Sequence, residues 1–464
     1  MSPLAPRGRQ SYVVNLPPQG HQVVLGTAGT GKTTMAMLRA DHLAAPETRN
    51  SGRVLLVTYN NALVTYLRHL QPATAANITV ETYGRFARGY LNSRGLMPRW
   101  GGIAKPGQRR RFIAQAVTEI APHFPKSAIL RRDIGFFLDE LAWIGGMGIK
   151  TLDEYKATKR YGRVTGLNDS QRERVWLVHL RYLKIREAAG PLYDWYDIAS
   201  SVLSALASDP RPRQYKHIIV DEGQDLLPEA VRSLAEAADP SGSVTFFGDY
   251  HQAIYGQGLS WRACGLKIAR KTEKFQDNYR NTAQIAALAI ALANSDVMQG
   301  DVDDLVVPIR PTAAGPPPTL AACRDQTHEI AVVQARAQAL SQGGSVAVLA
   351  RTWHDAERAT AGLVTRRLDP DMTRWDDTPG IYVGAYHSAK GLEFDTVIMP
   401  FLGADTVPMR DVVAAFGDED AAAREARLLY VALTRARSQL LMTYSGTLTP
   451  LLPLDPTLYV EVRP

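Results

Sequence analysis

The sequence predicts an α/β protein of two parallel-sheet units, each flanked by helices, with an α-helical insertion in the first unit. Apolar strand-like runs alternate with helical patterns over residues 20–91, return at 215–247, and alternate again from about residue 275. Such alternation requires crossover helices and therefore parallel sheets. Residues 96–204 show helical patterns alone. We therefore divide the 464 residues into a first unit, its insertion and a second unit, with these expected bounds: 1–95, 96–204, 205–274 and 275–464.

The expected elements follow from apolar periodicity. In the first unit, short apolar runs predict buried strands, and amphipathic patterns predict the helices that follow them. The expected strands of the first unit are 23–25, 53–58, 78–80, 215–220 and 244–247, and its expected helices are 32–44, 60–70 and 82–91. In the insertion we expect helices at 108–121, 128–144, 170–189 and 194–207. In the second unit we expect a helix at 283–294, a Gly/Pro-rich connector, and strands at 319–322, 345–349, 381–385 and 396–400.

The stretch after the first predicted strand has the composition of a phosphate-binding loop. Gly-Thr-Ala-Gly-Thr-Gly-Lys-Thr-Thr joins an apolar strand to a helix, which is the context that this motif requires. Glycines let backbone N–H groups surround an anion, and the helix N-terminus attracts it. Lys32 would then contact the β- and γ-phosphates of ATP, and the Thr33 hydroxyl would bind Mg²⁺. The alternative is a tight strand-to-helix turn with a solvated lysine.

A pair of carboxylates ends the strand predicted at 215–220. Asp221 and Glu222 would lie at the carboxyl edge of the sheet beside the phosphate loop, where Asp221 could hold Mg²⁺ and Glu222 could polarise an attacking water. The next strand leads to Gln252, which could sense the γ-phosphate or be a polar turn residue. Together, these features predict ATP hydrolysis.

Composition narrows the class of partner. The chain has a formal net charge of +7, and residues 96–204 hold 18 Lys and Arg against 11 Asp and Glu, so the insertion accounts for the whole excess. A positive insertion favours a polyanion, and the run Arg109-Arg110-Arg111 could contact phosphates or be a solvated helix face. Two cysteines suggest a reducing compartment, the cytoplasm, and no apolar run reaches membrane-spanning length.

An ordered set of motifs resembles the superfamily 1 DNA helicases of the UvrD/Rep/PcrA type over nearly the whole chain. The segments that carry the resemblance are residues 26–33, Thr58-Tyr59-Asn60-Asn61, Thr82-Tyr83, Tyr193-Asp194-Trp195-Tyr196-Asp197, Asp-Glu-Gly-Gln-Asp at 221–225, Gly-Asp-Tyr-His-Gln-Ala-Ile-Tyr at 248–255, Asn278-Tyr279-Arg280, His-Ser-Ala-Lys-Gly-Leu-Glu-Phe at 387–394 and Tyr-Val-Ala-Leu-Thr-Arg-Ala at 430–436. The resemblance implies two RecA-like P-loop NTPase lobes with ATP between them.

The resemblance also implies roles for individual residues. Arg280 and Arg435 would be arginine fingers that neutralise charge on the transferring phosphoryl group. Tyr279 would stack on adenine and Glu393 would bind the ribose hydroxyl. The implied catalytic residues are Lys32, Asp221, Glu222, Gln252, Arg280 and Arg435. The implied nucleotide-binding residues are Gln10, Gly26, Thr27, Ala28, Gly29, Thr30, Gly31, Lys32, Thr33, Thr34, Tyr279 and Glu393, with Thr33 and Asp221 at the metal. Gln19 is the alternative to Gln10 as the residue that reads adenine.

A single strand of nucleic acid would cross both lobes on aromatic and polar side chains. By resemblance, its contacts are Tyr59, Asn61, Thr82, Tyr255 and His387. Rim packing is an equally good interpretation for Thr82 and His387. The tryptophan that the family places two residues after Tyr255 is Gln257 here, and the displaced Trp261 is not given its role.

The motifs around His387 and Gln252 resemble the 3′→5′ branch of the family. A large second insertion, expected between about residues 351 and 381, is essentially absent, and we expect no nuclease-like segment at either end. The sequence therefore predicts an ATP-dependent 3′→5′ translocase or helicase on single-stranded DNA, or on RNA. The alternatives are a motor that needs a nuclease or other protein partner, and a nucleotide-gated binding module that does not move. DNA repair, plasmid or phage biology and antiviral defence all stay open as its setting.

Overall fold

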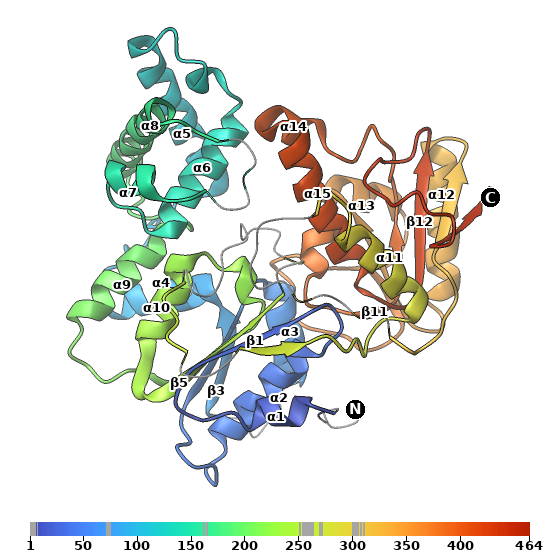
Figure 1. Cartoon of the computed structure of the whole chain (residues 1–464), viewed down its shortest axis with the longest axis horizontal. Coiled ribbons are helices and arrows are strands. Elements are labelled where there is room, and N and C mark those ends of the chain that lie inside the picture. Colours follow the sequence, from blue (N-terminus) through green and yellow to red (C-terminus); the bar gives the residue numbers. More distant parts are fainter. Residues whose placement is uncertain are drawn as a thin grey trace.

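The protein consists of two α/β lobes and a helical body that projects from the first lobe (Figure 1). The computed structural model describes residues 6, 8–70, 76–160, 163, 166–249, 252, 264–268, 272–298, 306, 309 and 311–464. In Figure 1 the first lobe is blue and yellow-green, the helical body is teal, and the second lobe is dark yellow to red. No helix in this described part of the chain is long and apolar enough to cross a membrane.

The first lobe is built on a six-stranded sheet in which every neighbouring pair is parallel, with strand order β3-β2-β4-β5-β1-β6. Its strands are β1 (Gly20–Gly26), β2 (Val54–Thr58), β3 (Ile78–Thr82), β4 (Tyr215–Val220), β5 (Ala238–Gly248) and β6 (Glu273–Phe275). The phosphate-loop strand β1 is separated from the carboxylate strand β4 by β5 alone. The order therefore brings the carboxyl ends of β4, β5 and β1 together, where α/β proteins bind ligands.

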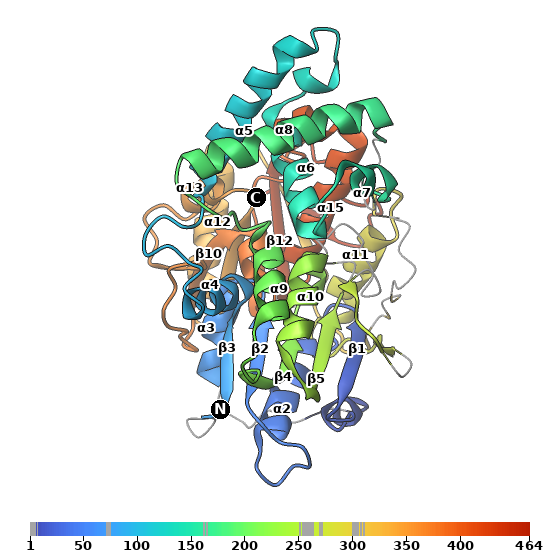
Figure 2. The ribbon, with the colours of Figure 1, turned by 90° about the vertical axis from the view of Figure 1, so that its left-hand side faces the viewer.

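Helices cover both faces of this sheet, as Figure 2 shows. One face packs against α2 (Lys32–Ala44) and α3 (Asn61–Leu70), and the other against α4 (Tyr83–Ser93), α9 (Ile198–Ser208) and α10 (Pro228–Ala237). Both faces need cover because successive side chains of a strand point to opposite faces of the sheet. In β1, Val24 is buried in the apolar core on the α2 side and Leu25 in the core on the α10 side. A short helix, α1 (Gln10–Val14), packs against α2.

The helical body has its own apolar core. It comprises α5 (Pro106–Ile120), α6 (Ile134–Met147), α7 (Leu152–Ala157) and α8 (Asp169–Ala188). Phe137, Trp143, Tyr155 and Val175 are buried in that core. The predicted helix at 194–207 appears as α9, but its residues Ile198 and Val202 are buried in the core of the first lobe.

The second lobe is a seven-stranded sheet of parallel pairs, ordered β13-β7-β12-β11-β8-β10-β9. Its strands are β7 (Thr319–Cys323), β8 (Ser345–Ala350), β9 (Thr365–Arg367), β10 (Gly380–Ala385), β11 (Phe394–Met399), β12 (Ala436–Ser445) and β13 (Val460–Val462). Its helices are α11 (Ala283–Ala293), α12 (Gln326–Leu340), α13 (Trp353–Ala359), α14 (Arg410–Phe416) and α15 (Asp418–Leu433). Helices α11 and α15 cover the face toward the first lobe.

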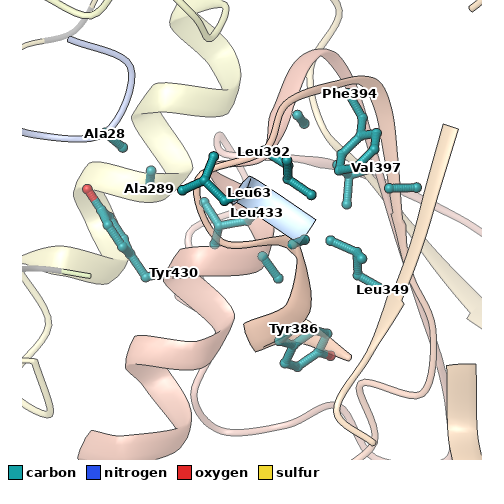
Figure 3. Close-up of a cluster of buried hydrophobic side chains, with 14 of the residues drawn as sticks. Ala28, Leu63, Ala289, Leu349, Tyr386, Leu392, Phe394, Val397, Tyr430 and Leu433 are labelled. Atoms are coloured by element: carbon teal, nitrogen blue, oxygen red, sulfur yellow. The ribbon is translucent and has the colours of Figure 1, made fainter. Parts of the chain in front are cut away.

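The two lobes share one apolar cluster. Figure 3 shows Leu63 of α3 among Leu392 and Leu433 of the second lobe, with Ala28 of the phosphate loop nearby. The approach is close, because a Cβ atom on Gly391 would lie 2.4 Å from a terminal methyl of Leu63. The lobes are therefore in direct contact beside the phosphate loop.

Candidate ATP site and nucleic-acid path

The phosphate loop connects β1 to α2 and depends on two left-handed glycines. Gly29 and Gly31 have φ values of +80° and +79°, a region that residues with a Cβ rarely adopt. A Cβ on Gly29 would lie 2.0 Å from Oδ1 of Asn278, and one on Gly31 would lie 2.4 Å from Nε2 of Gln10. The loop is therefore closely surrounded by side chains from α1 and from the segment after β6.

Gln10 is the glutamine that the structure brings to this loop. It is buried, and its Nε2 donates to the backbone oxygen of Thr30 at 2.9 Å. Gln19 is exposed, and its backbone oxygen accepts from Nε2 of Gln22.

Lys32 begins α2 and is folded over the loop. Its ammonium group donates to the backbone oxygens of Gly26 and Thr27, both at 2.8 Å, and lies 3.5 Å from Oδ2 of Asp249. Because only 6% of Lys32 is exposed, its charge is available to the loop rather than to solvent. Asp249 follows β5, so neighbouring strands supply the lysine and its acidic partner.

Thr33 and Asp221 form a pair of oxygen ligands at the loop. The Thr33 hydroxyl donates to Oδ2 of Asp221 at 2.8 Å, while Oδ1 of Asp221 is buried without a hydrogen-bond partner among the described residues. Burial, followed by the charge of Glu222, raises the pKa of Asp221 to about 7. A hard cation at Oδ1 would stabilise the ionised carboxylate, and oxygen atoms are the ligands that Mg²⁺ prefers. The residues present therefore fit a magnesium ion.

This pair differs from a metal cluster of several acidic or histidine side chains. Within the described ranges, no group of three or more His, Cys, Asp and Glu residues is placed to hold a metal ion. A Mg²⁺ ion here would depend on phosphate oxygens and water for its remaining ligands.

Glu222 lies at the same edge in a left-handed backbone conformation, with φ of +55°. Nε2 of Gln224 donates to its Oε2 at 2.6 Å, and the same Gln224 accepts from the Asp249 N–H at 2.9 Å. Burial raises the pKa of Glu222, but the charges of Lys390, Lys32 and Arg435 outweigh it and leave that pKa below its usual value. Glu222 is therefore a fixed, ionised carboxylate that is able to accept a proton.

Gln252 joins the two lobes. Its Nε2 donates to Oδ2 of Asp249 at 2.6 Å, and its Oε1 accepts from Nη2 of Arg435 at 2.6 Å. Lys390, from the second lobe, donates to the Gln252 backbone oxygen and forms an ion pair of 2.6 Å with Asp225. Burial, and then the charge of Arg280, lowers the pKa of Arg435 to about 10. Two buried cations of the second lobe thus reach the edge of the first sheet.

Arg280 and Tyr279 lie at the junction of the lobes. They follow β6, which pairs with β1, and the Tyr279 N–H donates to the backbone oxygen of Gly29 at 2.8 Å. Arg280 forms an ion pair with Glu393 at 2.6 Å, while its Nε is buried without a partner among the described residues. Although burial alone would raise the pKa of Glu393, Arg280 and Arg437 lower it to about 2. Tyr279 is 41% exposed.

The predicted nucleic-acid contacts lie at the carboxyl ends of strands. Tyr59 and Asn61 follow β2, Thr82 ends β3, and His387 follows β10; all four are partly exposed. Asn60 links two of these segments, because its Nδ2 donates to the Lys390 backbone oxygen at 3.0 Å. Thr82 also caps α4 by accepting from the Arg85 N–H at 3.4 Å. Tyr255 lies outside the described residues.

The segment around Asp194 joins the helical body to the first lobe. Buried Asp194 accepts from Nε of Arg109 at 2.8 Å and from the Tyr182 hydroxyl at 2.7 Å. Arg109 is therefore a buried structural residue, whereas Arg110 and Arg111 are exposed. For Arg109, both the expected phosphate contact and the alternative of a solvated helix face are wrong, because successive helical residues point in different directions and this one points inward.

Three residues in this region had no separate role in the sequence interpretation. Lys390 and Gln224 both lie within motifs quoted above. Lys390 contacts Asp225 and Gln252, which are distant in sequence. Gln224 contacts Asp249, which follows a different strand. Trp195 is 47% exposed, and a Cβ on Gly84 would lie 3.0 Å from its ring. Its place beside α4, next to Thr82, could have been suspected only from the surrounding Tyr-Asp-Trp-Tyr-Asp motif.

Comparison with known proteins agrees with this geometry. A family model described as an AAA domain matches residues 10–257, and one described as a UvrD-like helicase C-terminal domain matches residues 369–447. ATP-dependent DNA helicase UvrD2 of Mycobacterium tuberculosis is 24% identical, with 94% of this chain and 78% of the relative covered. DNA helicase II of Haemophilus influenzae is 25% identical over 60% of this chain and 39% of its own length.

Among solved structures, the C-terminal domain of a possible DNA helicase from a Lactobacillus species aligns over 39% of this chain and 98% of its own, with 23% identity and a TM-score of 0.29. That score is too low to support an argument about the fold. The first family model spans more than half of the chain, and the second adds the lobe that carries Arg435. The chain therefore belongs to the UvrD-like superfamily 1 helicases, a family of P-loop ATPases with two RecA-like lobes.

Proposed function

We propose that this protein is a DNA-stimulated ATPase that moves 3′→5′ along single-stranded DNA. One observation carries the proposal: Arg435 and Lys390 of the second lobe both bond to Gln252 at the edge of the first lobe, beside Lys32 and Glu222. A site assembled from both lobes is complete only when the lobes are closed. Each ATP turnover therefore couples to relative movement of the lobes, which a translocase requires.

In this proposal Lys32 leaves the loop carbonyls to contact the β- and γ-phosphates. Thr33 and Asp221 would hold Mg²⁺, which would supply positive charge to the bound nucleotide. Glu222 takes a proton from the attacking water, and Arg280 and Arg435 stabilise the charge of the transition state. Gln252 links the γ-phosphate to Arg435. Tyr279 stacks on the adenine ring, and Gln10 lies at the edge of that ring. Glu393 releases its ion pair with Arg280 and binds the ribose hydroxyl instead.

The strand would cross the carboxyl ends of β2, β3 and β10. Tyr59, Asn61, Thr82 and His387 lie there, with Tyr255 completing the predicted set and Trp195 as an added stacking platform. Stacking on aromatic rings tolerates any base, which suits a motor that does not read sequence. The 3′→5′ polarity rests on the resemblance of the motifs around Gln252 and His387 to that branch.

We further propose that unwinding of duplex DNA requires a protein partner. The described residues 351–379, where larger relatives carry a second insertion, form α13 and β9 and no other helix or strand. A motor without that domain has less surface with which to hold a duplex.

The first test measures ATP turnover with and without single-stranded DNA. Strong stimulation is expected, whereas equal rates would favour a nucleotide-gated binding module over a motor. The second test follows displacement of streptavidin from a biotin at either end of an oligonucleotide. Faster displacement from the 5′ end indicates 3′→5′ movement, and faster displacement from the 3′ end contradicts it. Efficient unwinding of blunt duplex by the protein alone would contradict the need for a partner.

A further inference from the structure

The helical body touches the second lobe as well as the first. Helix α6 lies beside α14, which Figure 1 shows at the upper end of the second lobe, on the side of the helical body. Arg424 of α15 makes two hydrogen bonds to Asp139 of α6, from Nη1 to Oδ1 at 3.2 Å and from Nη2 to Oδ2 at 3.1 Å. Next to this pair, a Cβ on Gly135 would lie 2.9 Å from Cβ of Ala415.

Asp139 is held rigidly on the side of the helical body. Arg163 also pairs with it, and the adjacent Glu140 binds Arg160, Arg163 and the Tyr155 hydroxyl. Burial would raise the pKa of Asp139, but Arg163 and then Arg424 outweigh it and lower that pKa. The carboxylate is therefore ionised and oriented, and a bidentate arginine contact of this kind specifies direction as well as distance.

The partner helix leads directly to the ATP site. Arg424 lies in the second turn of α15, and Arg435 follows the end of the same helix, about 16 Å further along at 1.5 Å per residue. Glu425, the next residue on α15, is buried and receives two 2.6 Å hydrogen bonds from Arg351 after β8. This bond fastens α15 to the sheet of the second lobe, so the helix moves with that lobe as one piece.

We propose that Asp139 and Arg424 are positioning residues, which couple the place of the helical body to the insertion of Arg435 at Gln252. This inference rests on the proposed DNA-stimulated ATPase. A strand bound beneath the helical body fixes that body relative to the first lobe. The Asp139–Arg424 pair then fixes α15, and α15 holds Arg435 against Gln252. With the pair broken, the strand still binds, but its effect on Arg435 is lost.

The experiment compares ATP turnover of the full chain with and without a single-stranded oligonucleotide. Arg424→Ala should lower the strand-stimulated kcat about tenfold, within the 5- to 150-fold range usual for coupling between sites. It should leave KM for ATP and the strand-free kcat unchanged. Arg424→Lys keeps the charge and should retain part of the stimulation. Lys156→Ala is the matched control, because Lys156 pairs with Glu173 inside the helical body at a similar exposure.

A reversible covalent link separates coupling from a general structural role. In the Gly135→Cys, Ala415→Cys variant the two Cβ atoms would lie 2.9 Å apart, about 1 Å closer than in a disulfide, so α6 and α14 must move apart slightly for the bond to form. The native cysteines, Cys264 and Cys323, are both buried. In the Arg424→Ala background, oxidation should restore the strand-stimulated rate, and reductant should remove it again.

The outcomes divide as follows. Full stimulation of Arg424→Ala, or a rescued rate that reductant does not change, would overturn the coupling and leave the proposed function intact. Absence of strand stimulation in the unmodified protein would overturn both.

Discussion

Arg435 and Gln252, 183 positions apart in the chain, are joined by a hydrogen bond of 2.6 Å from Nη2 to Oε1. Both side chains are 1% exposed. Gln252 in turn holds Asp249, and Asp249 lies 3.5 Å from the ammonium group of Lys32. A continuous path of polar contacts therefore connects the second lobe to the lysine of the phosphate loop.

The first prediction concerns Arg435. Arg435→Ala should lower the maximal ATPase rate about a thousandfold or more, because an arginine finger acts on charge that develops in the transition state. KM for ATP should change far less, since the ground state gains little from this contact. Steady-state kinetics decide, with the exposed Arg374→Ala of the same lobe as control. A rise in KM at an unchanged maximal rate would show that Arg435 only binds substrate.

The second prediction separates two residues of the first lobe. Glu222→Gln should reduce turnover about a hundred- to ten-thousandfold, as expected for loss of a positioned base, while ATP still binds. Lys32→Ala should reduce both turnover and affinity, because Lys32 contacts the bound nucleotide. Equilibrium binding of a fluorescent ATP analogue distinguishes the two variants. Near-normal turnover in Glu222→Gln would refute its assignment as the base.

Much of the fold around this site follows from local sequence. The helix predicted at 32–44 and the strand predicted at 215–220 have the same bounds in the structure, because a glycine turn, a Lys-Thr start and a strand that ends in Ile-Ile-Val are local signals. The carboxylate pair and the phosphate loop meet as expected, since parallel strands share a carboxyl edge.

The contacts between elements could not be predicted in the same way. Lys390 reaches Gln252 and Asp225 across more than a hundred residues, and no periodicity specifies that pairing. Arg109 looks like a solvated charge, yet it is buried on Asp194, which tertiary packing alone decides. Helix α7 was not predicted, because six residues with a capping box at Thr151 give too short a pattern.

The third prediction uses the pH dependence of stability. His179 is buried in the helical body; burial lowers its pKa to about 4, with Asp194 opposing this shift and Arg186 adding to it. Since the folded-state pKa lies below the unfolded value, its contribution to stability is present above about pH 6.5 and is lost as the pH falls toward 4. Between pH 7 and pH 5 the loss is about 2 kcal/mol.

Urea unfolding at several pH values tests this expectation. His179→Leu should flatten the decline in unfolding free energy between pH 7 and pH 5, whatever its effect at neutral pH. His123→Leu, a change at an exposed histidine of the same body, should leave the slope unchanged. An identical slope in His179→Leu and the unmodified protein would contradict the assignment.

The fourth prediction divides the arginine run by burial. Arg109→Ala should destabilise the helical body by about 3 kcal/mol, since the buried Asp194 carboxylate loses its 2.8 Å arginine partner and keeps only the Tyr182 hydroxyl, the Tyr196 N–H and Arg186 at 3.8 Å. Arg110→Ala with Arg111→Ala should leave stability unchanged and weaken DNA binding, with the logarithmic salt slope falling by roughly 0.7 for each lost phosphate contact. Measuring the DNA affinity of the unmodified protein and of the double variant across a series of salt concentrations tests this prediction. Superimposable slopes would mean that this face is solvated and does not touch DNA.

Residues 278–282 tie Arg280 and Arg435 together at the boundary between the lobes. Tyr279 bonds to the phosphate loop, while Thr282, three residues later, donates its N–H to the Arg437 backbone oxygen at 3.2 Å. Between them, Nδ2 of Asn281 donates to the backbone oxygens of Thr434 and Ala436, which flank Arg435. The two arginines therefore lie on segments that are bonded to each other. When the lobes part after hydrolysis, we expect both guanidinium groups to withdraw in one step, so that the site loses both charges at once.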